Sequence, residues 1–91
     1  MSPKLYLNMY YVYILKITGV KGKNFYIGYT SDLKKRLQQH IVGRVKTTNG
    51  RNPKLIYYEA FEDKYLALKR EKGIKSSGSV YASLIKRLGL K

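Results

Sequence analysis

Two side chains spaced one helical turn apart are the first candidates for a functional site. Arg36 and His40 are four residues apart, so a helix places them on one side. They would flank an apolar stripe that consists of Leu33, Leu37 and Ile41. Such a pair can take part in chemistry only if other groups join it, and histidine titrates near neutral pH. The simpler interpretation is that Arg36 is a solvated base and His40 a surface or satisfied side chain.

Two tyrosines on predicted strands are further candidates. Alternation places Tyr13 on one face of an expected strand at residues 10–17, and Tyr26 on one face of a second at residues 24–30. The two phenols can therefore converge. Gly28 shares the face of Tyr26 and would leave a floor for substrate backbone, although a bulge or tight packing explains a strand glycine equally well. Ordinary cross-strand packing is the alternative role for both tyrosines.

The chain carries only five acidic residues, and one of them has no local structural explanation. Four lie near the start of a predicted helix, where the helix dipole favours negative charge, namely Asp32, Glu59, Glu62 and Asp63. Glu71 instead falls in the middle of the second predicted helix, at the margin of its buried face, and can ligate a metal ion. The competing interpretation is a solvated ion pair with Lys75, four residues later.

The elements that must position these side chains predict an α+β fold. Strands are expected where aromatic and β-branched residues cluster, at residues 10–17, 24–30 and 55–61, with a turn at 18–23. Helices are expected at residues 31–41, about 62–75 and, after a break and recapping at Gly78 and Ser79, 80–88. The order ββαβαα indicates a small three-stranded antiparallel sheet flanked by helices. We expect a single domain at residues 10–88 after a short leader, residues 1–9.

The charge balance indicates a polyanionic partner. Nineteen Lys and Arg against five Asp and Glu give a net charge of +14, and nucleic acid is the default partner of such a chain. Residues 42–54 combine glycine, asparagine and proline with four basic residues, which predicts a surface loop that faces phosphate. Together with one helix residue, these bases form the candidate nucleic-acid contacts, which are Lys35, Arg44, Lys46, Arg51 and Lys54.

Composition excludes several classes of protein. Without cysteine, the chain has no disulfide framework, no thiolate zinc site and no cysteine nucleophile. The apolar runs are too short to span a bilayer, and the first residues lack the order of a secretion signal. We therefore expect a soluble cytoplasmic protein without a membrane partner.

Taken in order, these motifs resemble those of the GIY-YIG nucleases, and more closely those of their small single-domain bacterial branch, related to the nuclease domain of the excision-repair incision subunit. YVYIL stands at the first motif, with Tyr13 as its tyrosine, and YIG begins at Tyr26 as the second motif unchanged. SDLKKRLQQH resembles the family helix, with Arg36 as its arginine and His40 where members carry histidine or tyrosine. KREKGIK supplies Glu71 as the family acid.

The resemblance implies a metal-dependent DNA endonuclease with weak sequence specificity, acting as a monomer or homodimer. One divalent cation, Mg²⁺ or Mn²⁺, would be held by Glu71 and otherwise by water and substrate phosphate. Arg36 would stabilise charge on the scissile phosphate. Tyr13 or Tyr26 would orient or deprotonate the attacking water, with nearby cations lowering the phenol pKa, and His40 is the competing base or a proton relay. The rival interpretations are a catalytically weak or inactive nucleic-acid-binding module of the same fold and an RNA-directed structural protein.

Overall fold

Three strands and three helices follow one another in the order that the sequence predicts. The computed structural model describes residues 9–19 and 24–90. Its elements are β1 (Tyr10–Lys16), β2 (Phe25–Thr30), α1 (Leu33–Ile41), β3 (Lys54–Phe61), α2 (Lys64–Ser76) and α3 (Gly78–Arg87). The order ββαβαα and the α+β class are thereby confirmed. Most of the predicted leader and of the predicted turn at 18–23 lies outside the described residues.

β1 is the central strand of an antiparallel sheet with the order β2-β1-β3. Residues 12–15 of this strand are all buried, as expected of a continuous apolar run that is covered on both faces. The register places Tyr13 opposite Gly28 on β2 and opposite Tyr58 on β3. In the strand order, β2 is an edge strand that pairs with β1 on one side and has no other sheet partner within the described residues.

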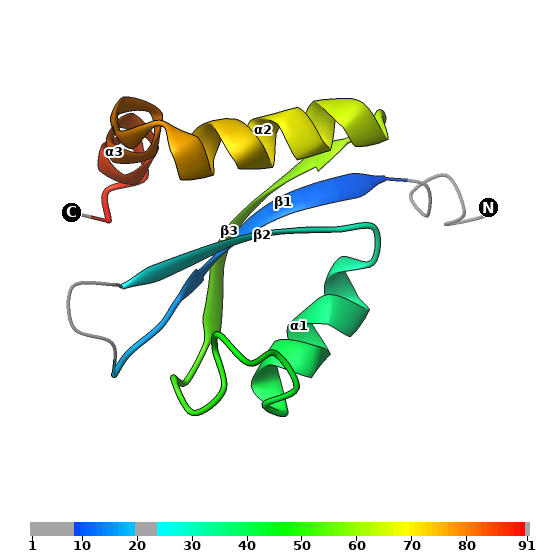
Figure 1. Cartoon of the computed structure of the whole chain (residues 1–91), viewed down its shortest axis with the longest axis vertical. Coiled ribbons are helices and arrows are strands. Elements are labelled where there is room, and N and C mark those ends of the chain that lie inside the picture. The colour runs from blue at the N-terminus through cyan, green and yellow to red at the C-terminus, as the bar shows by residue number, and fades with distance from the viewer. Residues whose placement is uncertain (1–8, 20–23, 91) are drawn as a thin grey trace.

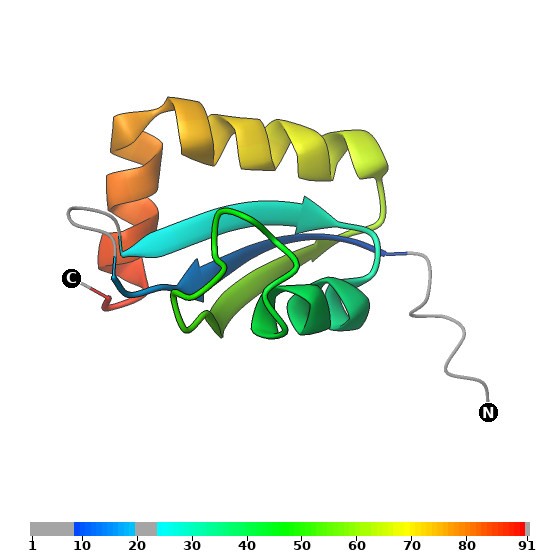
Figure 2. The ribbon, with the colours of Figure 1, turned by 60° about the horizontal axis from the view of Figure 1, so that its bottom comes forward.

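Helices cover both faces of the sheet, with α2 and α3 on one side and α1 on the other (Figure 1; Figure 2). On the first face, a core cluster consists of Val12, Ile14, Ile27, Ala67, Ile74 and Leu84. On the second face, Tyr13, Leu15 and Ile17 pack against Leu33 and Leu37 of α1. Alternation along β1 therefore sends successive side chains into two separate cores. Within residues 9–19 and 24–90, no helix has the length and apolar character required to cross a membrane.

Capping side chains set the helix starts. The Asp32 carboxylate accepts a hydrogen bond from the backbone N–H of Lys35 at 3.1 Å, so α1 begins at Leu33 and Asp32 caps it from outside the first turn. Asp63 caps α2 in the same way. Ser77 caps α3, which starts at Gly78 rather than beyond the predicted break at Gly78 and Ser79.

One ion pair fastens α2 to β3 and corrects the sequence-based explanation of Glu59. Arg70 donates from Nε and Nη2 to the two carboxylate oxygens of Glu59, both at 2.8 Å, and the Tyr57 hydroxyl donates to the same carboxylate at 2.7 Å. These bonds from Arg70 lower the pKa of Glu59. The helix-dipole explanation of Glu59 was therefore wrong, because this residue lies within β3 and its partner is eleven positions away.

One expectation fails at the end of α1, and the segment after this helix differs from expectation at two residues. Ile41 was predicted to complete the apolar stripe of this helix, but its side chain is 62% exposed, and the neighbouring His40 is buried instead. The segment between α1 and β3 was predicted to lie on the surface and to face phosphate. Most of its residues are exposed, as predicted, but Val45 and Thr48 are buried, and Thr48 has a buried polar partner in His40.

Candidate active site

Three aromatic rings from three different elements meet on the α1 side of the sheet. The ring centroid of Tyr26 on β2 is 5.0 Å from that of His40 on α1, and Tyr13 on β1 lies 5.6 Å from His40 and 6.2 Å from Tyr26. The antiparallel pairing of β1 with β2 brings the tyrosines together, and α1, which packs on this face of the sheet, places the His40 ring against both of them. The predicted convergence of Tyr13 and Tyr26 is confirmed.

A buried chain of hydrogen bonds runs from β1 to the segment after α1. The Tyr13 hydroxyl lies 2.7 Å from His40 Nε2, and His40 Nδ1 lies 2.7 Å from Thr48 Oγ1. Thr48 Oγ1 in turn lies 3.5 Å from the carbonyl oxygen of Val45. If the threonine hydroxyl donates to that carbonyl, it accepts from Nδ1–H, and Nε2 is left to accept from Tyr13. We therefore assign the Nδ1–H tautomer to His40.

Burial decides the protonation states within this chain. His40 is 1% exposed, and burial, with a smaller contribution from the charge of Arg36, lowers its pKa to about 4. The imidazole is accordingly neutral at pH 7. Tyr13 is also 1% exposed, and its burial raises its pKa to about 12 although Arg36 acts in the opposite direction. The expectation that nearby cations lower the phenol pKa is therefore wrong for Tyr13, because desolvation outweighs them.

The guanidinium of Arg36 interacts with both tyrosines, Tyr13 and Tyr26. Its pKa is raised first by the Tyr13 phenol and to a smaller extent by that of Tyr26, so the positive charge lies close to both rings. Arg36 Nη1 also donates to Gln39 Oε1 at 3.0 Å, which fixes one arm of the guanidinium on its own helix. A cation with spare donors therefore stands beside the aromatic cluster, as a phosphate contact requires.

Gly28 makes room for the Tyr13 ring. A Cβ atom at this position would overlap Cζ and Oη of Tyr13 and would lie 2.8 Å from its Cε1. The prediction of an open floor for substrate backbone is thus wrong, and the tight packing weighed against it is observed. The YIG motif therefore requires glycine at this position because any side chain would overlap the ring of Tyr13 on the paired strand.

Glu71 lies on the other side of the edge strand, on α2, with a partly buried side chain. Its neighbours Ala67 and Ile74 are buried, as predicted, and its side chain is only 19% exposed. Lys75 Nζ lies 3.0 Å from Glu71 Oε2, so the predicted ion pair exists, although its acidic member is only partly exposed. The charge of Glu71 contributes to the raised pKa of Tyr13. The carboxylate therefore acts electrostatically on the aromatic cluster across β2.

The donor set around Glu71 limits the type of metal it can hold. No group of three or more His, Cys, Asp or Glu side chains converges anywhere in residues 9–19 and 24–90. A structural zinc site, which needs four protein ligands, does not fit this arrangement. A Mg²⁺-like cation that takes one carboxylate and otherwise keeps water and substrate phosphate does fit.

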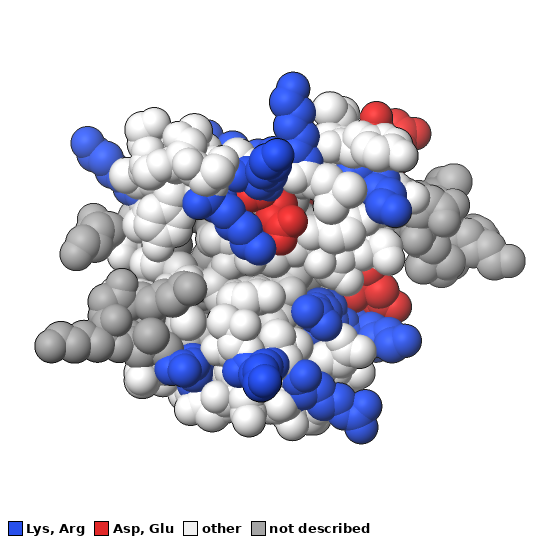
Figure 3. Space-filling view, viewed as in Figure 1, with Lys and Arg blue, Asp and Glu red and all other residues white. Residues whose placement is uncertain are grey.

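The candidate nucleic-acid contacts do not form one cluster. Three of them are exposed on α1 and in the segment after it, namely Lys35, Arg44 and Lys46. Lys54 is exposed but pairs with Lys16 in the sheet register, on the face opposite Tyr13. Figure 3 shows that basic side chains lie both above and below an acidic patch in the middle of one face. Basic groups therefore lie on two sides of this acidic patch.

Arg51 differs from the other four because its guanidinium already has protein partners. Nε donates to the Thr47 carbonyl at 2.9 Å and Nη1 to the Gly19 carbonyl at 3.3 Å. The Thr18 backbone N–H also donates to the carbonyl of Arg51 at 2.8 Å. Arg51 thus ties the segment before β3 to the end of β1, and this bracing role was not predicted.

Thr48 is the site residue that the sequence did not reveal. It is fully buried and is the only side chain bonded to His40 Nδ1 among the residues that the structure describes. Its place in a polar, glycine-containing segment predicted exposure, and its partner lies eight residues back beyond a helix end. No periodic pattern joins two such positions, so the signal was absent from the sequence.

Comparison with known proteins agrees with this geometry. Residues 9–80 match the model of the GIY-YIG catalytic domain family, and the chain belongs to that family as a small single-domain, nuclease-like protein. A UPF0213 protein of Clostridium perfringens is 48% identical over 69 residues, which cover 74% of this chain and 71% of the relative. One from Haloquadratum walsbyi is 39% identical over 69 residues, 74% of each chain. The solution NMR structure of a UPF0213 protein from Bacillus halodurans is 33% identical, with a TM-score of 0.52, and covers 86% of this chain and 83% of that one.

Proposed function

We propose that the protein is a metal-dependent endonuclease that hydrolyses phosphodiester bonds in DNA with weak sequence specificity. One observation carries this proposal: the motif tyrosines, Arg36 and His40 converge on one side of the edge strand, and the partly buried Glu71 stands on the other. A cation beside phenols and a lone carboxylate are the groups that phosphate hydrolysis uses for charge stabilisation and water activation.

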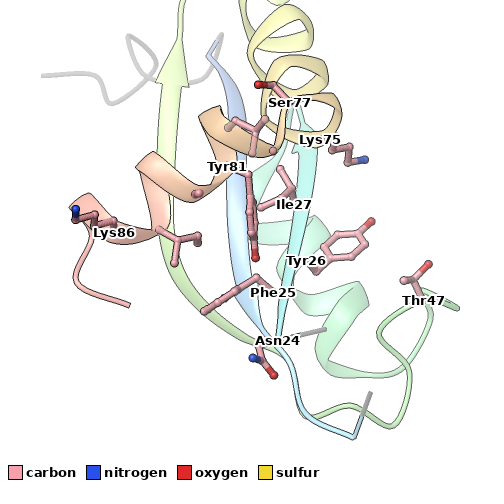
Figure 4. A pocket seen from close by; sticks show the side chains of 13 residues that line it. Asn24, Phe25, Tyr26, Ile27, Thr47, Lys75, Ser77, Tyr81 and Lys86 are labelled. Atoms are coloured by element: carbon pink, nitrogen blue, oxygen red, sulfur yellow. The ribbon is translucent and has the colours of Figure 1, made fainter. Parts of the chain in front are cut away.

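Tyr26 is the tyrosine that is able to meet the attacking water. It is only half-buried, and it points away from β2 into a surface groove (Figure 4). Tyr13 is fully buried and its hydroxyl is bonded to His40. Tyr26 would therefore orient or deprotonate the water, while Arg36 would stabilise the charge that develops on the scissile phosphate.

His40 fits a positioning role better than the role of a base that touches substrate. Its imidazole is buried, both ring nitrogens are hydrogen-bonded, and its pKa of about 4 makes it a weak base at neutral pH. Through the Nδ1–H tautomer, Thr48 and His40 would hold the Tyr13 phenol against Gly28 and against the ring of Tyr26. These hydrogen bonds from Thr48 through His40 to Tyr13 would keep the aromatic cluster rigid while substrate binds.

Glu71 would hold one divalent cation, Mg²⁺ or Mn²⁺, together with water and substrate phosphate. When bound, the cation would neutralise part of the phosphate charge that Arg36 does not reach. Lys75 would compete with this cation for the carboxylate, because its ammonium lies 3.0 Å from Oε2. This pairing also favours a second candidate function, a nucleic-acid-binding module in which Glu71 stays paired and no cleavage occurs.

Nicking of supercoiled plasmid with Mg²⁺ or Mn²⁺ separates the two functions. The nuclease proposal expects cleavage by wild type and a loss of about 100-fold or more in Arg36→Ala and Glu71→Ala. It also expects Glu71→Ala to retain salt-sensitive DNA binding. If wild type binds DNA but nicks no faster than both variants, the binding module is the correct function.

A further inference from the structure

A groove follows the outer edge of β2 and extends well beyond the residues that take part in the chemistry proposed above. Its volume is about 1060 Å³, and it lies between β2, the α2–α3 junction and Thr47 of the segment before β3 (Figure 4). Because β2 is an edge strand of the sheet, its outward backbone groups have no sheet partner among residues 9–19 and 24–90. The groove is therefore a surface with polar backbone along one wall.

The lining of the groove is apolar inside and basic at two borders. Phe25 and Ile27 of β2 and Tyr81 of α3 supply its inner surface, and Tyr81 extends from α3 toward Phe25 (Figure 4). Lys75 and Lys86 also line it and lie toward different ends of α3. Apolar and aromatic surface suits the faces of nucleobases, and flanking ammonium groups suit the phosphates of the same strand.

The groove opens directly onto the candidate active site through two residues. Tyr26 lines the groove, and its ring lies 5.0 Å from that of His40. Lys75 lines it as well, and its ammonium is 3.0 Å from the carboxylate of Glu71. A chain that lies in the groove would therefore pass the proposed water-activating phenol and the proposed cation ligand.

We propose that this groove binds an unpaired strand of the nucleic-acid substrate. At least one base leaves the stack of its neighbours and packs against Phe25 and Tyr81. The inference rests on the proposed function and specifies its substrate as nucleic acid with a single-stranded segment beside the cleaved bond. An intact duplex keeps its base faces stacked and offers none to an apolar groove. The net charge of +14 favours a polyanionic strand over an uncharged peptide at this edge.

Two neighbouring substitutions on α3 test the groove. Ala82 lines it, whereas the adjacent Ser83 is exposed outside it, so Ala82→Glu and Ser83→Glu change the net charge equally. The probes are a fluorescein-labelled oligothymidylate of about 12 nucleotides and an abasic chain of the same length, both in EDTA so that no cleavage occurs. Anisotropy gives the affinities, and circular dichroism checks that both variants are folded.

We expect wild type to bind the oligothymidylate about tenfold or more tightly than the abasic chain. Ala82→Glu should lose about tenfold in affinity for the oligothymidylate, and Ser83→Glu less than about twofold. Equal affinity of wild type for the two chains, or equal losses in the two variants, would overturn the proposal. If these differences appear but plasmid nicking fails, the groove proposal stands and the nuclease proposal falls. If nicking succeeds and the differences are absent, only the groove proposal falls.

Discussion

The substitution Gly28→Ala should disrupt the aromatic cluster from the strand opposite Tyr13. The added methyl group would overlap Cζ and Oη of Tyr13, atoms that belong to a rigid ring buried against β2. The ring must therefore move away from Gly28, and its hydroxyl must move with it. The 2.7 Å hydrogen bond from Tyr13 to His40 Nε2 cannot survive such a displacement unchanged.

The expected loss of stability follows from two effects. Overpacking a buried position costs about 1–3 kcal/mol. Weakening a hydrogen bond between two buried groups costs about 1 kcal/mol more. The free energy of unfolding should therefore fall by about 2–4 kcal/mol, which for a chain of this size lowers Tm by about 10–30 °C.

Urea denaturation and thermal melts measure this loss, and a second glycine provides the control. Gly73 lies within α2, and a Cβ there would meet no atom within 4 Å. Gly73→Ala should therefore stabilise the protein by about 0.4–1 kcal/mol, since alanine favours helix and restricts the unfolded chain. The packing argument would be refuted if Gly28→Ala were as stable as wild type and the ¹⁵N NMR resonances of the His40 ring were unchanged.

Three other predictions concern the buried polar groups. The pKa of His40 is about 4 in the folded state and about 6.5 in the unfolded state, so the unfolded state binds more protons between these two pH values. The free energy of unfolding should therefore fall as pH drops through this range, by up to about 3 kcal/mol. Urea denaturation at several pH values should show a smaller dependence of this free energy on pH in His40→Gln. The chain has a single histidine, so ¹⁵N NMR reports the His40 tautomer directly. We expect the Nδ1–H tautomer in wild type and in Thr48→Ser, but a mixture of tautomers in Thr48→Val. An unchanged spectrum in Thr48→Val would exclude the positioning role of Thr48. Glu59→Gln should lower stability by about 1–2 kcal/mol through its bonds to Arg70 while leaving cleavage by the folded protein intact, and a stability equal to wild type in denaturation would contradict that account.

The strands and the faces of their side chains were predictable from local pattern. A continuous apolar run marks β1 as central, and alternation along two antiparallel strands is enough to bring Tyr13 and Tyr26 together. The placement of Glu71 at a buried margin was predictable for the same reason, because helical spacing sets it beside Ala67 and Ile74. These features depend on neighbours within one element or one hairpin.

The remaining features depend on contacts that no local pattern contains. His40 is buried because the segment after α1 folds back and supplies Thr48, and Glu59 is explained only by Arg70 on another element. The capping role of Asp32 shifts a helix start that composition alone placed earlier. The groove along β2 exists only because α3 packs near the sheet edge, which a linear sequence does not display.

The most direct test of the central claim compares two carboxylates in one cleavage assay. Glu71→Gln and Glu62→Gln remove the same charge, but Glu71 lies partly buried across β2 from the aromatic cluster, whereas Glu62 is exposed before α2. The rate of plasmid nicking at saturating Mg²⁺ or Mn²⁺ should fall by about 100-fold or more in Glu71→Gln and stay at the wild-type value in Glu62→Gln. Cleavage by Glu71→Gln at the wild-type rate would contradict the assignment of Glu71 as the cation ligand and with it the proposed mechanism.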